Sequence, residues 1–134
     1  MIGGERLSSL ESMLAGDHVR LDRAFQAIVT RAYGGDYQQL EGEWVTFERA
    51  LQQHLDAEER TLIPALAQDR PGEARVLLEE HARMRVTALQ LGVELDLHCL
   101  RAERVETFVE SLRAHALRAE NIFYPWVDRH LAGN

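Results

Sequence analysis

Apolar side chains recur every three or four positions along almost the whole chain, which is the period of an α-helix with one buried face. Breaks in this pattern divide the chain into four stretches. Their apolar positions are Leu10, Leu14, Leu21, Phe25 and Ile28; Leu40, Trp44, Phe47, Leu51 and Ala65; Leu78, Met84, Ala88, Leu91 and Leu95; and Val105, Phe108, Leu112, Ile122 and Trp126. No segment alternates with period two for long enough to form a strand, so the pattern predicts four helices.

Turn-forming residues locate the breaks. Gly34-Gly35-Asp36 and the segment 68–72 contain the residues that turns favour. A weaker break follows Leu95, where Asp96 could cap the next helix. The expected helices span roughly residues 6–33, 37–68, 72–95 and 98–131. Because the connections are short, the sequence predicts an all-α, up-down-up-down four-helix bundle, with residues 1–134 as one domain.

Composition and net charge limit the classes of binding partner and the cellular compartment that we expect. The net charge of −7 argues against nucleic acid and against anionic membranes, because both attract clustered Lys and Arg. The first ten residues, MIGGERLSSL, contain no apolar leader, and no apolar run approaches the ~20 residues that span a bilayer. A single cysteine, Cys99, excludes an internal disulfide and suits a reducing compartment. We therefore expect a cytoplasmic protein.

Each helix carries one histidine where its apolar stripe calls for a core residue. These are His18, His54, His81 and His115. The first two lie 17 and 19 residues from the turn at Gly35, and the other two lie 15 and 19 residues from Asp96. At ~1.5 Å per residue all four fall at about one level of an antiparallel bundle. Burying four imidazoles without partners is costly, so the spacing points to a metal site.

The chain also repeats itself. The segment HLDAEERTLIPAL, residues 54–66, has the same pattern as HALRAENIFYPWV, residues 115–127. Likewise DHVRL, residues 17–21, is similar to EHARM, residues 80–84. The two histidines of each half are separated by 36 and 34 residues. Two similar helical hairpins, related by an approximate twofold axis, would place two metal half-sites face to face.

The donor types favour iron, manganese or zinc, since imidazole and carboxylate occur without a thiolate cluster. Glu58 follows His54 by four residues and shares its face of the helix. Glu120 follows His115 by five, so it either reaches in from the flank or requires a π-bulge in the helix. Glu59 lies about 100° from Glu58, which favours a solvated residue over a ligand.

Tyr124 could donate a hydrogen bond near the metal site, but its helical phase argues against this role. Trp44, Trp126, Phe47 and Phe123 are expected in the core.

These motifs resemble the hemerythrin-like (HHE) cation-binding domains. The resemblance extends from about Asp17 to Val127 and is carried by Asp17-His18, His54-x-x-x-Glu58-Glu59, Glu80-His81 and His115-x-x-x-x-Glu120. It implies a non-haem di-iron centre, with nitrogen ligands His18, His54, His81 and His115 and bridging carboxylates Glu58 and Glu120.

Oxygen-carrying members of this family have a His-x-x-x-His pair on the third helix, but Leu77 stands four residues before His81. The resemblance therefore favours an iron-sensing or stress-related protein over an oxygen carrier.

The sequence favours a binding protein that senses or binds iron, dioxygen or nitric oxide. The alternatives are a di-iron enzyme acting on peroxide, an iron storage or stress-repair protein, and a metal-free bundle that binds a partner. No catalytic residue is predicted apart from the metal ligands, and enzyme activity stays open. Iron is the expected cofactor, zinc or manganese would also suit, and the sequence predicts no oligomeric state.

Overall fold

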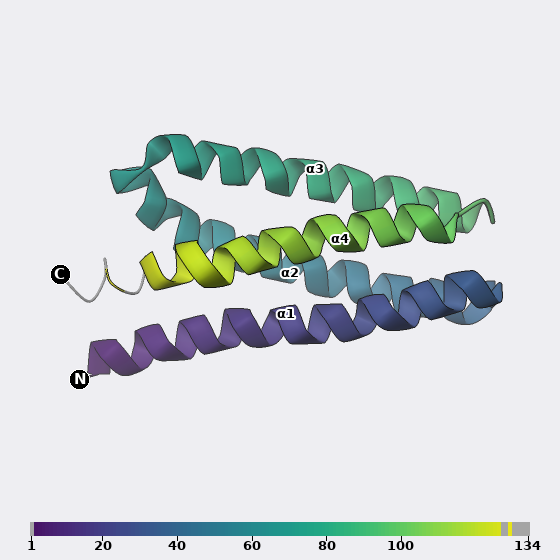
Figure 1. Cartoon of the computed structure of the whole chain (residues 1–134), viewed down its shortest axis with the longest axis horizontal. Coiled ribbons are helices and arrows are strands. Elements are labelled where there is room, and N and C mark those ends of the chain that lie inside the picture. The colour runs from purple at the N-terminus through teal and green to yellow at the C-terminus, as the bar shows by residue number, and fades with distance from the viewer. Residues whose placement is uncertain (1, 127–128, 130–134) are drawn as a thin grey trace.

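In the part of the chain that the structure describes, four long α-helices are present, and each runs antiparallel to the next one in the sequence (Figure 1). The computed structural model describes residues 2–126 and 129, and side chains from residue 16 onward. The helices are α1 (Ile2–Gly34), α2 (Tyr37–Asp69), α3 (Pro71–Asp96) and α4 (Ala102–Arg118). The fourth continues through a π-helical turn, η1 (Ala119–Phe123), and a further α-helical turn at 124–126. The all-α, up-down-up-down bundle predicted from the sequence is confirmed.

Local chemistry makes the first two turns. Gly35 adopts a left-handed φ of 72°, a conformation that glycine reaches without a steric penalty. Asp36 then caps α2 by accepting a hydrogen bond from the Gln39 backbone N–H, at 3.4 Å. Only Arg70 separates α2 from α3, and Pro71 opens α3 at the position where a missing N–H costs nothing.

The third turn differs from the prediction. Asp96 is the last residue of α3 and not a cap, and α4 begins at Ala102 instead of 98. The cause is His98, which adopts a left-handed φ of 55° and ends α3. The N–H groups of Cys99 and His98 then donate to the carbonyls of Glu94 and Leu95, at 2.8 and 2.9 Å.

Two helix limits also differ. The first helix starts at Ile2 and not at residue 6. The predicted end of the fourth helix, at 131, lies outside the described residues.

The buried apolar side chains form two clusters, one on each side of a polar layer. The first cluster lies between this layer and the turns at Gly35 and His98, and the rings of Phe25, Trp44 and Phe108 surround Phe47 in it, with centroids 4.5–6.4 Å away. The second cluster lies towards the α2–α3 turn and comprises Leu62, Ile63, Leu66, Ala74, Leu77, Ala119, Phe123, Tyr124 and Trp126.

Two predicted core positions are exposed instead. Leu78 is 43% exposed, whereas Leu77 is 1% exposed, because the buried positions of α3 follow a strict alternation of three and four residues that includes 77. Ile122 is 50% exposed, because the π-helical turn adds one residue and brings Phe123 inward. The side chains of Leu10 and Leu14 lie outside the described part of the chain.

The helices do not pack equally. α2 lies against α1 and α3 along much of its length, whereas α3 and α4 touch little. Open grooves of about 390 and 500 Å³ follow the α3–α4 side of the bundle. Among the described residues, no helix combines the length and apolarity needed to cross a bilayer.

Replacing Phe47 by alanine tests this core. Phe47 is fully buried between three other rings, so Phe47→Ala should lower the free energy of unfolding by about 3–5 kcal/mol. Urea denaturation of the metal-free protein measures this loss. Val45→Ala, on the same helix but 55% exposed, serves as the control and should change stability by no more than about 0.5 kcal/mol. Similar losses for both variants would contradict the described register of α2.

Candidate metal centre

The four predicted histidines meet in the polar layer between the two apolar clusters. His54, His81 and His115 are 3%, 1% and 6% exposed, and the side chain of His18 is 9% exposed. They form two pairs. The rings of His18 and His54 lie 4.6 Å apart between α1 and α2, and those of His81 and His115 lie 5.2 Å apart between α3 and α4.

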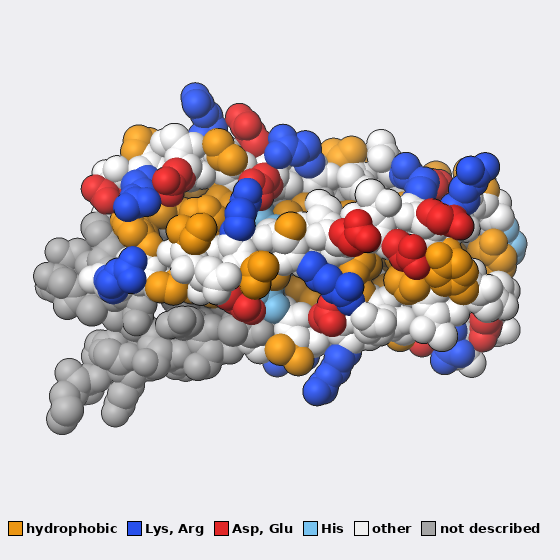
Figure 2. Space-filling view, in the orientation of Figure 1, with side chains coloured by type: hydrophobic (Ala, Val, Ile, Leu, Met, Phe, Trp, Pro, Cys, Tyr) orange, Lys and Arg blue, Asp and Glu red, His pale blue; other side chains and the backbone are white. Residues whose placement is uncertain are grey.

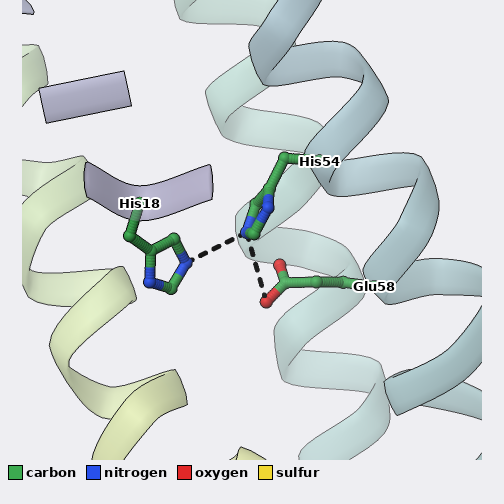
Figure 3. A group of neighbouring side chains, drawn as sticks. All are labelled: His18, His54 and Glu58. Atoms are coloured by element: carbon green, nitrogen blue, oxygen red, sulfur yellow. Dashed lines mark hydrogen bonds and ion pairs between the residues drawn. The ribbon is translucent and has the colours of Figure 1, made fainter. Parts of the chain in front are cut away.

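Glu58 lies between the two pairs and has no exposed surface. Its Oε1 lies 3.1 Å from His81 Nε2 and 3.3 Å from His115 Nε2, while its Oε2 lies 3.7 Å from His54 Nε2. Figure 3 shows His54 and Glu58 on one helix, with the His54 ring directed towards His18. Among the described residues, two groups of donor atoms within 4.8 Å of one another could each hold a cation. We call His18, His54 and Glu58 the first half-site, and Glu58, His81 and His115 the second half-site.

An outer carboxylate contacts the Nδ1 atom of every one of these histidines. The pairs are His18–Glu120 at 2.9 Å, His54–Asp17 at 3.1 Å, His81–Glu59 at 2.8 Å and His115–Glu80 at 3.0 Å. Because an ionised carboxylate only accepts hydrogen bonds, Nδ1 carries the proton in each pair. The Nε2 lone pairs are then left for the centre of the bundle, which is the tautomer and orientation that metal-ligating histidines adopt.

Arginines contact three of the four outer carboxylates. Arg85 Nη1 donates to Glu59 at 2.5 Å, Arg118 donates to Glu80, and Arg20 donates to Asp17. On the face of the molecule shown in Figure 2, arginine and acidic side chains are interspersed, and neither sign of charge forms a large patch. These contacts fix the carboxylates and, through them, the histidine rings.

Glu120 is expected from the sequence to bridge two metal ions. The structure contains the π-helical turn that was one of the two alternatives, and it places the Glu120 carboxylate on the outer nitrogen of His18. The side chain is 38% exposed and belongs to neither half-site. Glu59, expected to be solvated, has the corresponding contact with His81. A ligand role for Glu120 stays a prediction.

Tyr124 is a residue of this centre against which the helical phase had argued. Its side chain is 3% exposed, and its hydroxyl donates to Glu58 Oε2 at 2.7 Å and lies 3.2 Å from His18 Nε2. Counting positions along a regular α-helix directs Tyr124 away from the site. The five-residue step from His115 to Glu120, for which a π-bulge was one of two explanations, was the signal that this count fails beyond residue 119.

Burial and close contacts shift the pKa values of the ionisable side chains in the centre. Burial raises the pKa of Glu58, but hydrogen bonds from His115, His54 and His81 outweigh it and hold this pKa well below its ordinary value. Burial lowers the pKa of His54 and of His115, yet their contacts with carboxylates leave both pKa values raised. Burial, together with the charge of Glu58, raises the pKa of Tyr124 far above its ordinary value. Without metal, the Glu58 anion therefore faces His54 and His115, whose pKa values are both raised, and the hydroxyl of Tyr124.

The residues fit a cation. A metal ion with bonds of about 2.1 Å separates neighbouring ligand atoms by about 3.0–3.4 Å. The Nε2 atoms of His18 and His54 are 3.0 Å apart, and the closest contacts in the second half-site are 3.1 and 3.3 Å. Imidazole nitrogens with a carboxylate form a donor set suited to iron, manganese and zinc.

Fold and centre together define a four-helix-bundle protein with a histidine–carboxylate cation site. The family model described as the hemerythrin HHE cation binding domain matches residues 9–127, and the chain belongs to this family. Searches of curated proteins and of solved structures returned no match.

The outer carboxylates can be tested through Glu80. Glu80→Gln keeps the shape but removes the charge that orients His115, so the metal affinity should fall roughly 10–100-fold. Competition with a chelator of known affinity measures the change. Glu79→Gln makes the same change in charge at the neighbouring, exposed position and should leave the affinity unaltered. Equal affinities of the two variants would show that Glu80 does not support the metal site.

Proposed function

We propose that this protein is a non-haem di-iron protein of the cytoplasm that binds or senses a small molecule, with dioxygen and nitric oxide as the leading candidates. The observation that carries the dinuclear proposal is the placement of Glu58, whose two carboxylate oxygens face different histidine pairs. A carboxylate in this position can bridge two ions, one in each half-site. The exposed, unpaired Cys99 is compatible with the reducing environment of that compartment.

A small cavity beside the metal centre supports the proposal that the ligand is a small molecule. It has a volume of about 40 Å³ and is lined mostly by apolar side chains of the first core cluster, together with His18, His54, His115 and the charged Asp22 and Arg113. This volume accommodates a water or a diatomic molecule but not an organic substrate. The mostly apolar lining favours an uncharged ligand. The cavity lies beside both half-sites.

Leu77 supports an open position in the second half-site. It lies four residues before His81, on the same face of α3, and is 1% exposed within the second apolar cluster. Its side chain offers no donor atom, so His81, His115 and Glu58 are the donors available there within the described part of the chain. When bound, a pair of iron ions supplies one-electron redox chemistry and room for a further ligand. The chain's own residues would hold the ions and fix the imidazole tautomers.

Peroxide breakdown is the alternative, and one observation favours it. The groove of about 390 Å³ between α3 and α4 reaches His115 and is lined by Glu80, Ser111 and Arg118. It gives solvent and small polar molecules a route to the second half-site. Disproportionation of hydrogen peroxide to water and dioxygen by the iron-loaded protein, faster than by free iron, would decide for this alternative.

Iron content tests the dinuclear proposal. Anaerobic loading with iron(II) should give close to two ions per chain by elemental analysis. Glu58→Gln keeps the shape of the side chain but removes the shared charge, and it should reduce the content to one ion or fewer. Glu110→Gln, an exposed position on α4, is the matched control and should keep two. A wild-type content of one ion or fewer would show that the centre is not dinuclear. A Glu58→Gln content unchanged from wild type would show that Glu58 does not bridge the two ions.

Reaction with air tests the open position. We expect the iron(II) protein to oxidise in air and not to recover under vacuum. Leu77→His adds an imidazole on the same face as His81 and should slow this oxidation several-fold, as followed by the visible absorption of iron(III). Leu77→Gln introduces a polar side chain without an imidazole and should not slow it. A wild-type protein that takes up and releases dioxygen repeatedly without net oxidation would instead establish an oxygen carrier.

A further inference from the structure

The hydroxyl of Tyr124 lies among the donor atoms of one half-site. It is 2.7 Å from Glu58 Oε2, 3.2 Å from His18 Nε2 and 3.5 Å from His54 Nε2. These three atoms are the ones that the first half-site directs towards its centre. The phenol ring is nearly parallel to the His18 ring, with an angle of 20° and centroids 5.7 Å apart, so neighbouring side chains fix its direction.

The distances match a shared coordination sphere better than a simple outer contact. Each outer carboxylate touches only the Nδ1 atom of its histidine, on the side facing away from the centre. Tyr124 instead approaches the inward Nε2 atoms of both His18 and His54. Its three distances, 2.7–3.5 Å, bracket the separation of about 3.0–3.4 Å expected between ligands of one ion.

We propose that the Tyr124 oxygen is a fourth protein ligand of the ion held by His18, His54 and Glu58, and that it binds iron(III) as a phenolate. The inference rests on the proposed iron site. On binding, the oxygen–hydrogen bond breaks, the oxygen–iron bond forms and the proton leaves to solvent, as is usual when metals displace protons from ligands.

This ligand would make the two half-sites unequal. Within the internal repeat, Tyr124 follows His115 by nine residues, and the equivalent residue after His54 is Ile63, which has no donor atom. The first half-site then has four protein ligands and the second has three. A small molecule is thereby directed to the ion held by His81 and His115, on the side of the α3–α4 groove.

Phenolate bound to iron(III) produces a visible charge-transfer band, and resonance Raman excitation in that band shows the vibrations of the tyrosine ring. The chain has three tyrosines, Tyr33, Tyr37 and Tyr124, so the source of the signal can be assigned. The full chain is loaded with iron(II), oxidised, and compared with Tyr124→Phe and with the double variant Tyr33→Phe/Tyr37→Phe. Iron content is measured on each sample.

We expect the wild type and the double variant to show the phenolate signature and Tyr124→Phe to lack it while retaining iron. Because the double variant keeps Tyr124 as its sole tyrosine, its spectrum decides the matter even if Tyr124→Phe fails to fold. Iron-loaded protein without the signature, or with the signature unchanged in Tyr124→Phe, would overturn the inference and leave Tyr124 as a hydrogen-bond donor to Glu58. Failure of the wild type to bind iron is a separate result, which refutes the proposed function as well.

Discussion

The carboxylate of Glu58 is an anion without exposed surface at the centre of four helices. A buried charge is stable only when it is paired and hydrogen-bonded, or when it binds a metal. This constraint accounts for the histidine that interrupts the apolar stripe of each helix at one level. It also accounts for the division of the core, since the polar layer separates the cluster around Phe47 from the cluster around Leu77.

The same constraint also applies to the charges of the residues around Glu58. The centre contains five carboxylates, which are Glu58 and the four outer carboxylates that contact the Nδ1 atoms. Arginines contact three of the outer carboxylates. With neutral imidazoles the group keeps a formal surplus of two negative charges. Protons on His54 and His115 can offset it in the metal-free protein, consistent with the raised pKa of each. Cations and protons therefore compete for the same negative field.

Periodicity and spacing were enough to predict the bundle and the level at which the histidines meet, because both follow from regular helices joined by short turns. The misplacement of Leu78 is an error of helical phase within the regular helix α3. The other errors arise where the helix is irregular. The π-helical turn changes the phase beyond Ala119, which exposes Ile122 and brings Tyr124 inward. The left-handed conformation of His98 ends α3, and Asp96 is the last residue of that helix instead of the cap of the next one.

The outer carboxylates were beyond sequence reasoning for a different reason. Asp17 precedes His18 in the sequence but contacts His54 on the neighbouring helix, and Glu80 likewise contacts His115 and not His81. Such contacts depend on how adjacent helices face each other, which periodicity along one helix does not encode.

The internal repeat is kept in the outer contacts and broken at the centre. Each hairpin supplies two histidines, an acidic residue before the first of them and a glutamate five residues after the second. Where one half has Glu58, however, the other has Ala119, and Tyr124 corresponds to Ile63. A fully symmetric centre would hold two equivalent ions with equal access. Because the four histidine–carboxylate contacts are kept and the donor atoms differ at the innermost positions, the scaffold can orient both histidine pairs in the same way while making one half-site richer in donors. That combination suits a site that retains its metal at one position and receives a small molecule at the other.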